Sequence, residues 1–160
     1  MKIFLILHNI RSVFNVGSIF RTADAFGVKK IYLAGYTPDP AQKTALGAEK
    51  YVPQEKIKSP QKLIRKLKEE NFFVISLENC INNSININRF ASLASKKKFK
   101  KYNSIALILG NEIKGLPKSV RDSSHAVVEI SMKGKKESLN VSVAAGIALH
   151  VLSSKIFFKN

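Results

Sequence analysis

The sequence contains one cysteine, no tryptophan, and only 8 glycines and 5 prolines among its 160 residues. Cys80 cannot form an internal disulfide, so we expect a reducing compartment, the cytoplasm. No apolar run approaches the roughly 20 residues that span a bilayer. The start of the chain lacks the apolar stretch and cleavage site of a signal peptide. These absences exclude a disulfide-rich secreted domain, collagen and a membrane protein.

Acidic residues are also scarce, because 27 Lys and Arg stand against 11 Asp and Glu, a formal net charge of +16. Hydrophobic residues make up 45%, too many for a disordered chain, and the length suits one domain over residues 1–160. Such a charge favours binding to nucleic-acid phosphates. An acidic membrane surface is an alternative partner, and solubility conferred by lysine is another explanation.

Apolar runs alternate with amphipathic stretches along the chain. We predict strands at Lys2–Leu7, Lys30–Ala34, Phe72–Leu77, Ser104–Leu109 and Ala126–Ile130. We predict helices at Val13–Phe26, at Pro60–Asn71 with Ser59 as N-cap, a short one beginning at Pro117, and one at Ser138–Phe158. The alternation predicts an α/β fold, with a mainly parallel sheet flanked by helices.

Common nucleotide and metal fingerprints are missing from the sequence. No G-x-G-x-x-G follows the first strand, and Leu116 stands where a phosphate-binding loop would have lysine after Gly115. His8, His125 and His150 are too widely spaced to suggest a metal pair. We therefore expect neither a dinucleotide-binding fold nor a bound metal.

Asn15, Gly17 and Arg21 form the first unusual polar cluster, inside the predicted helix Val13–Phe26. At 100° per residue, Asn15 and Arg21 lie about 120° apart around the helix axis, so both can border one pocket. Gly17 permits close approach of another backbone. The alternative is a capped helix with a surface arginine.

The second cluster runs from Gly110-Asn111-Glu112 to Gly115-Leu116. It follows an apolar strand directly, where open α/β sheets place ligands. The alternative is a turn stabilised by glycine.

The third cluster comprises Ile130, Met132 and Gly134, followed by Ser138-Leu139-Asn140-Val141-Ser142. A strand ends, a loop follows, and a helix begins where backbone N–H groups are free to bind a ligand. Helix capping alone would explain Ser138 but not Asn140 as well.

Taken together, in this order and spacing, the three clusters resemble the motifs of the SPOUT methyltransferases, in the SpoU (TrmH) branch. The resemblance covers nearly the whole chain. One departure is Ser131, because the third motif of that family usually has proline there. A loop without this proline is expected to be less rigid, which bears on cofactor affinity.

The resemblance implies a deep trefoil knot near the C-terminus, S-adenosylmethionine (AdoMet) as cofactor without metal, and a homodimer whose active site joins both chains. It implies a cofactor pocket lined by Leu77, Gly110, Ile130, Met132 and Leu139. It implies that the reactive-site polar groups are Asn15, Arg21, Glu112, Ser138 and Asn140. For the dimer we expect apolar surface on the helix Val13–Phe26 and on a C-terminal helix face, namely Val141, Ala144, Ala145, Ala148 and Leu152.

The implied reaction is methyl transfer to a ribose 2′-hydroxyl of RNA. Arg21 is the base proposed for that family or, more in keeping with its chemistry, a clamp for the RNA phosphate. Glu112 is expected to hold Asn15 or its own loop rather than to remove a proton.

Because few residues precede Asn15, we expect this domain to bind RNA itself, without a separate RNA-binding domain. We favour tRNA over ribosomal RNA, since compact members of this branch usually modify tRNA. The lysine run 96–101 is a candidate phosphate contact or simply a solvated loop.

The competing functions are a non-catalytic basic RNA-binding protein and a nucleotide-binding α/β regulator. A binder needs lysines, whereas Asn15, Arg21, Ser138 and Asn140 together suggest an enzyme. The regulator is disfavoured by the missing glycine-rich fingerprints.

Overall fold

A computed structural model describes residues 1–79, 81–94 and 99–156. Its strands form one sheet in the order β3-β2-β1-β6-β4-β7-β5, and all the neighbouring pairs are parallel. The bounds are β1 Lys2–His8, β2 Lys30–Ala34, β3 Gln54–Ile57, β4 Phe72–Leu77, β5 Ile85–Asn86, β6 Ser104–Leu109 and β7 Ala126–Glu129. The predicted α/β class with a parallel sheet is confirmed.

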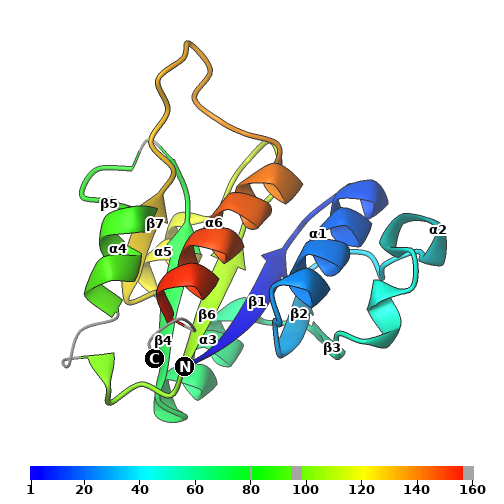
Figure 1. The fold of residues 1–160 in the computed structure, drawn as a ribbon, viewed down its shortest axis with the longest axis horizontal. Coiled ribbons are helices and arrows are strands. Elements are labelled where there is room, and N and C mark those ends of the chain that lie inside the picture. Colours follow the sequence, from blue (N-terminus) through cyan, green and yellow to red (C-terminus); the bar gives the residue numbers. More distant parts are fainter. Residues whose placement is uncertain (80, 95–98, 157–160) are drawn as a thin grey trace.

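Helices cover both faces of this sheet (Figure 1). On one face, α1 (Val13–Ala25), α4 (Ile87–Ala94) and α6 (Val141–Ile156) bury one hydrophobic core. On the other, α3 (Pro60–Glu69) and α5 (Lys118–Asp122) bury a second core. Beside α1 lie the short helix α2 (Gln42–Ala45) and the 3-10 helix η1 (Ala48–Lys50). The central strands are therefore buried on both faces, as their continuous apolar runs require.

The parallel arrangement brings the carboxyl ends of β1, β4, β6 and β7 to one edge of the sheet. The loop 130–140 projects from this edge and leads into α6, which lies between α1 and α4 (Figure 1). The motifs that follow the strands therefore meet at this edge.

Two expectations about the C-terminal helix need correction. It begins at Val141 rather than Ser138, because Asn140 acts as its N-cap, and its predicted end at Phe158 lies outside the described residues. Most of the predicted apolar face is not free for a partner, because Val141, Ala145, Ala148 and Leu152 are buried within the chain, and Ala144 is half-buried.

Sequence patterns missed the short elements α2, η1, β3, β5 and α4. The sequence Gln-Glu-Lys-Ile of β3 is mostly exposed at the sheet edge and has no apolar alternation, and β5 has two residues. The buried residues of α4, which are Ile87, Phe90, Ala91 and Ala94, do show helical spacing, so a signal for that helix was present.

None of the helices in the described part of the chain is long and apolar enough to cross a bilayer.

Gly17 lies on the face of α1 that packs against α2. A Cβ at this position would lie 2.2 Å from Thr44 Oγ1 and 2.6 Å from the Thr44 backbone carbon. The close backbone approach expected at Gly17 is thus made by the protein itself. We predict that Gly17→Ala costs about 2 kcal/mol and lowers Tm by about 4–8 °C.

The matched control is Gly134→Ala, because a Cβ at Gly134 meets nothing within 4 Å. Thermal unfolding followed by circular dichroism compares the two variants. Equal Tm values for both would show that the contact between α1 and α2 is not tight.

Candidate functional site

A pocket opens at the carboxyl edge of the sheet, between the ends of β4, β6 and β7 and the start of α6. It is lined by four of the five residues predicted for cofactor binding, which are Leu77, Gly110, Ile130 and Leu139. Further apolar lining comes from Leu109, Val141 and Ala144. Met132, the fifth, lies in an adjoining hollow that shares Asn79 and Ile130 with the pocket.

Gly110 is closely enclosed at this pocket. A Cβ there would lie 2.7 Å from both the Gly115 carbonyl carbon and the Leu116 nitrogen. The loop 110–116 therefore folds back on itself so tightly that only glycine fits at its start.

The Glu112 carboxylate joins this loop to the start of α1. It accepts hydrogen bonds from the backbone N–H of Arg11 at 3.0 Å and of Ser12 at 3.1 Å. It also accepts one from the Asn15 side-chain amide at 2.9 Å. Glu112 therefore holds Asn15, which is one of the two contacts expected for it.

Asn15 is in turn hydrogen-bonded to Asn140, the residue before α6. Its side-chain oxygen accepts a hydrogen bond from Asn140 Nδ2 at 3.1 Å, and Asn140 Oδ1 accepts from the Ser142 N–H at 2.9 Å. We call this set of contacts the Glu112–Asn15–Asn140 junction. It brings one residue from each of the three sequence clusters into a single hydrogen-bonded chain.

Two opposing effects act on the pKa of Glu112. Burial raises it, but the hydrogen bonds from Arg11, Asn15 and Ser12 stabilise the ionised form and outweigh burial, so the pKa lies below its ordinary value. Glu112 is accordingly a carboxylate at neutral pH and is suited to accept hydrogen bonds, not to take up a proton.

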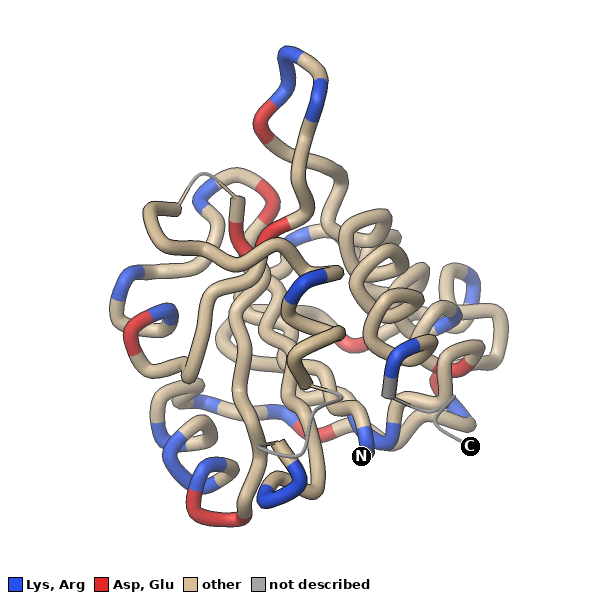
Figure 2. Tube along the Cα trace, turned by 60° about the vertical axis from the view of Figure 1, so that its left-hand side comes forward, with Lys and Arg blue, Asp and Glu red and all other residues tan. Residues whose placement is uncertain are grey.

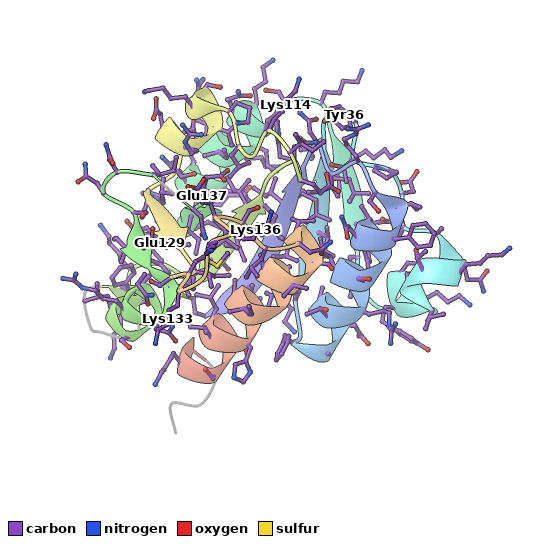
Figure 3. All side chains as sticks on the ribbon, turned by 90° about the horizontal axis from the view of Figure 1, so that it is seen from above. Tyr36, Lys114, Glu129, Lys133, Lys136 and Glu137 are labelled. Atoms are coloured by element: carbon purple, nitrogen blue, oxygen red, sulfur yellow. The ribbon has the colours of Figure 1, made fainter. Side chains whose placement is uncertain are left out.

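Asn111 fixes the other side of the same loop. It donates to the Asn9 carbonyl oxygen at 2.8 Å and to the Tyr36 hydroxyl at 2.9 Å. Its own side-chain oxygen accepts from the N–H groups of Ile113 and Lys114. Tyr36 and Lys114 lie on one side of this edge, and Glu129 and Lys133 on the other (Figure 3).

Two residues that were not predicted from the sequence also line the pocket, namely Glu78 and Asn79, directly after β4. Glu78 Oε2 accepts from the Leu116 N–H at 2.7 Å. Asn79 makes two hydrogen bonds with the backbone of Ile130, one as donor at 3.0 Å and one as acceptor at 3.2 Å. Their position just beyond a buried strand was the signal available in the sequence.

Arg21 lies neither at the junction nor in the pocket of its own chain. It is exposed and lies in a separate depression with Ser18, Thr22 and Phe26. Ser138, in contrast, lines the pocket beside Leu139.

Basic residues gather on the projecting loop 130–140 (Figure 2). They are Lys133, Lys135 and Lys136, and all three are exposed. Part of the predicted lysine contact, residues 96–98, lies outside the described residues, whereas Lys101 Nζ lies 5.0 Å from the centre of the Tyr102 ring. Among the described residues, no group of three His, Cys, Asp or Glu could hold a metal ion.

The model of the SpoU rRNA Methylase family matches residues 2–150 of this chain. The chain is 28% identical to the putative TrmH family tRNA/rRNA methyltransferase YacO of Bacillus subtilis, over 95% of this chain and 58% of that protein. It is 29% identical to the 23S rRNA (guanosine-2'-O-)-methyltransferase RlmB of Escherichia coli, over 91% of this chain and 57% of that protein. It thus spans less than three-fifths of the length of these relatives.

Two solved structures share the fold. The AdoMet-bound rRNA methyltransferase of Sinorhizobium meliloti matches with a TM-score of 0.84 and 26% identity, over 97% of this chain and 57% of that one. The TrmH/SpoU tRNA modifying enzyme of A. aeolicus matches with a TM-score of 0.83 and 25% identity, over 96% and 75%.

The lowered pKa of Glu112 generates a prediction on stability. The ionised carboxylate stabilises the folded chain at pH values above its ordinary pKa, and this contribution is lost as pH falls through the lowered pKa. We predict that Glu112→Gln costs about 1 kcal/mol at neutral pH, a modest value because the carboxylate is partly exposed. The difference from the unmodified chain should vanish in acid.

Urea unfolding at a series of pH values measures this difference. Asp24→Asn, an exposed change on α1, is the matched control. A Glu112→Gln penalty that stays constant with pH would contradict the carboxylate's role.

Proposed function

We propose a function for this chain, which belongs to the SpoU rRNA Methylase family, in the SpoU (TrmH) branch of the SPOUT methyltransferases. In this proposal, the chain transfers a methyl group from AdoMet to a ribose 2′-hydroxyl of RNA. The observation that carries the proposal is the Glu112–Asn15–Asn140 junction at the mouth of the pocket. Neither a simple RNA-binding protein nor a nucleotide regulator needs two amide side chains held in place by a carboxylate beside a largely apolar pocket.

The pocket fits AdoMet by its chemistry. Leu77, Leu109 and Leu139 offer apolar surface for a flat ring, and the carboxylates of Glu78 and Glu112 complement a positively charged ligand. The solved structure of the Sinorhizobium meliloti rRNA methyltransferase with AdoMet bound adds support. When bound, AdoMet would supply a methyl group already activated by its sulfonium; the sulfur would leave as the neutral thioether of S-adenosylhomocysteine, and the proton of the hydroxyl would pass to water.

The protein residues then have the task of positioning the hydroxyl group. A methyl transfer of this kind needs its reacting atoms in line, so fixed orientation supplies much of the rate. Asn15 and Asn140 each hold the other's side chain, and Glu112 fixes Asn15. In this proposal they orient the ribose, and Ser138 contacts the ribose or its 3′-phosphate.

Arg21 completes the site in a homodimer, in our proposal, by reaching the pocket of the partner chain. Its guanidinium clamps the RNA phosphate through paired hydrogen bonds. Support comes from exposed apolar side chains on the adjacent helices α1 and α6, which are Phe14, Val143 and Ile147. Phe14 is 71% exposed and is therefore accessible to a partner chain.

A trefoil knot is part of the same proposal. After β6 the chain crosses to α5, returns as β7 on the far side of β4, and then passes back over the carboxyl edge into α6. The contact of Asn140 with Asn15 places the start of α6 beside the loop 110–116. This path supports threading of the C-terminal segment near that loop.

We propose tRNA as the RNA substrate, with ribosomal RNA as the second candidate. The similar A. aeolicus protein is a tRNA modifying enzyme, which supports tRNA. Escherichia coli RlmB is a 23S rRNA methyltransferase, which supports ribosomal RNA. The net charge of +16 fits either polyanion.

Mass spectrometry of nucleosides tests the function. Unmodified tRNA and ribosomal RNA are incubated separately with the protein and AdoMet, and 2′-O-methylnucleosides are quantified. We expect them in tRNA. Methylation of ribosomal RNA alone would select the second candidate. RNA binding without any methylation would leave only the non-catalytic protein.

Arg21→Lys tests the phosphate clamp. A lysine keeps the charge but loses the forked donors, so turnover should fall about 10²–10³-fold, while RNA affinity falls modestly. Arg89→Lys, an exposed change on α4, is the control and should behave normally. If Arg21→Lys has normal turnover at saturating RNA, Arg21 contributes only positive charge to the surface and is not a phosphate clamp.

Mixed dimers test whether Arg21 acts across chains. Arg21→Lys and Asn140→Ala chains are each expected to be nearly inactive alone. In a mixed dimer, one site receives an intact Arg21 from the partner and keeps an intact Asn140, so roughly half of the activity per dimer should return. A mixed dimer as inactive as its parents, or a stable monomer in light scattering, would contradict the shared site.

A further inference from the structure

A second hollow, with a volume of about 400 Å³, lies on the opposite face of the sheet from α1 and α6. One wall is α3, and the other is formed by β2, β3 and the residues after β3. Its apolar base includes Leu63, Leu67 and Tyr32. Five lysines line it, together with a single acidic residue, Glu55: they are Lys30, Lys56, Lys58, Lys62 and Lys66. We call this hollow the lysine groove.

Three of the lysines have acidic neighbours. Lys30 pairs with Glu55 at 2.6 Å, Lys56 with Asp39 at 2.7 Å, and Lys66 with Glu70 at 3.9 Å. Each of these ion pairs offsets the charge of one lysine, so these three lysines add less net positive charge to the groove than unpaired lysines would.

Lys58 and Lys62 form no ion pair with any residue that the structure describes, and both are exposed. They flank Ser59, the N-cap of α3, where the helix dipole adds positive potential. Lys62 is followed one turn later by Lys66, about 6 Å further along the same side of the helix. Unbalanced positive charge is thus concentrated at one end of the groove and continues along α3.

We propose that the lysine groove binds backbone phosphates of RNA, as a contact separate from the pocket at the carboxyl edge. The inference rests on the proposed function only in taking RNA as the polyanion. Tyr32 is the one aromatic residue lining the groove, and it is 8% exposed, so bases have no ring on which to stack. Phosphates are the groups that exposed lysines recognise without reading the sequence.

An acidic membrane is the competing partner, and the groove suits it less well. Membrane-surface sites combine basic residues with apolar side chains that insert between lipids. Here Leu63 and Leu67 are buried against the sheet, and Ile57 is half-buried. The groove therefore offers charge in a concave setting without an exposed apolar anchor.

The groove and the pocket are formed by different elements of the fold. The groove belongs to the edge strand β3, its neighbour β2 and the helix α3, whereas the pocket lies at β6, β4 and β7. An RNA that occupies both must extend from one face of the sheet to the other. Affinity contributed by the groove can then be removed without touching the Glu112–Asn15–Asn140 junction.

The test compares two double variants of equal charge. Lys58→Gln with Lys62→Gln alters the groove, and Lys2→Gln with Lys29→Gln alters exposed lysines at the amino ends of β1 and β2. Fluorescence anisotropy measures binding to a labelled tRNA transcript over a range of salt concentrations, without AdoMet. Unchanged Tm values verify that both variants are folded.

The groove variant should raise Kd about tenfold at 0.1 M salt and reduce the slope of log K against log salt by about 1–2, as expected for two lost phosphate contacts. The amino-end variant should change both quantities much less. Equal losses in the two variants would overturn the proposal in favour of net charge alone, and normal RNA binding by the groove variant would overturn it outright.

A parallel measurement uses vesicles containing phosphatidylserine. Vesicle binding that is lost in the groove variant while RNA binding is retained would assign the groove to membranes and overturn the proposal. The proposed function is judged separately. RNA binding through the groove without methyl transfer would reject only the function, and methyl transfer with an unimportant groove would reject only this inference.

Discussion

The carboxylate of Glu112 is the group on which the arrangement of the site depends. One side chain on the loop after β6 accepts hydrogen bonds from the backbone ahead of α1 and from the Asn15 amide. The partners are 97 to 101 residues apart in the sequence. Because the carboxylate is ionised, these hydrogen bonds are charge-assisted and stronger than those of a neutral acceptor. Without them, Asn15 would lose the contact that sets its amide for Asn140.

The parallel sheet makes this meeting possible. Each of β1, β6, β4 and β7 ends at the same edge, so short polar stretches after the strands become neighbours. Glycine then permits a packing that other residues would prevent, since Gly110 touches the backbone of its own loop and Gly17 that of α2. The apolar pocket and the amide groups at its mouth follow from this combination. It is the arrangement from which we infer a methyl transfer site.

Many elements of the fold and residues of the site were predictable from the sequence. The others were missed for physical reasons. Long apolar strands such as Phe72–Leu77 and Ser104–Leu109 were predicted at their observed bounds, because burial on both faces leaves a clear pattern. The helix start at Val141, with Asn140 as N-cap, was missed because Ser138 is an equally good cap by composition. Glu78 and Asn79 were missed since their roles arise from contacts with Leu116 and Ile130, remote in sequence. The placement of Arg21 in a shared site depends on a second chain and stays a prediction.

Hydrogen exchange measured by mass spectrometry, with and without AdoMet, tests the central claim that the segments following β4, β6 and β7 form one cofactor pocket. Ligand binding protects the backbone amides that it orders. We predict that peptides covering residues 77–79, 109–116 and 130–144 gain protection together, while peptides from α3 do not change. The account is contradicted if AdoMet protects none of these segments, or if protection appears in α3 instead.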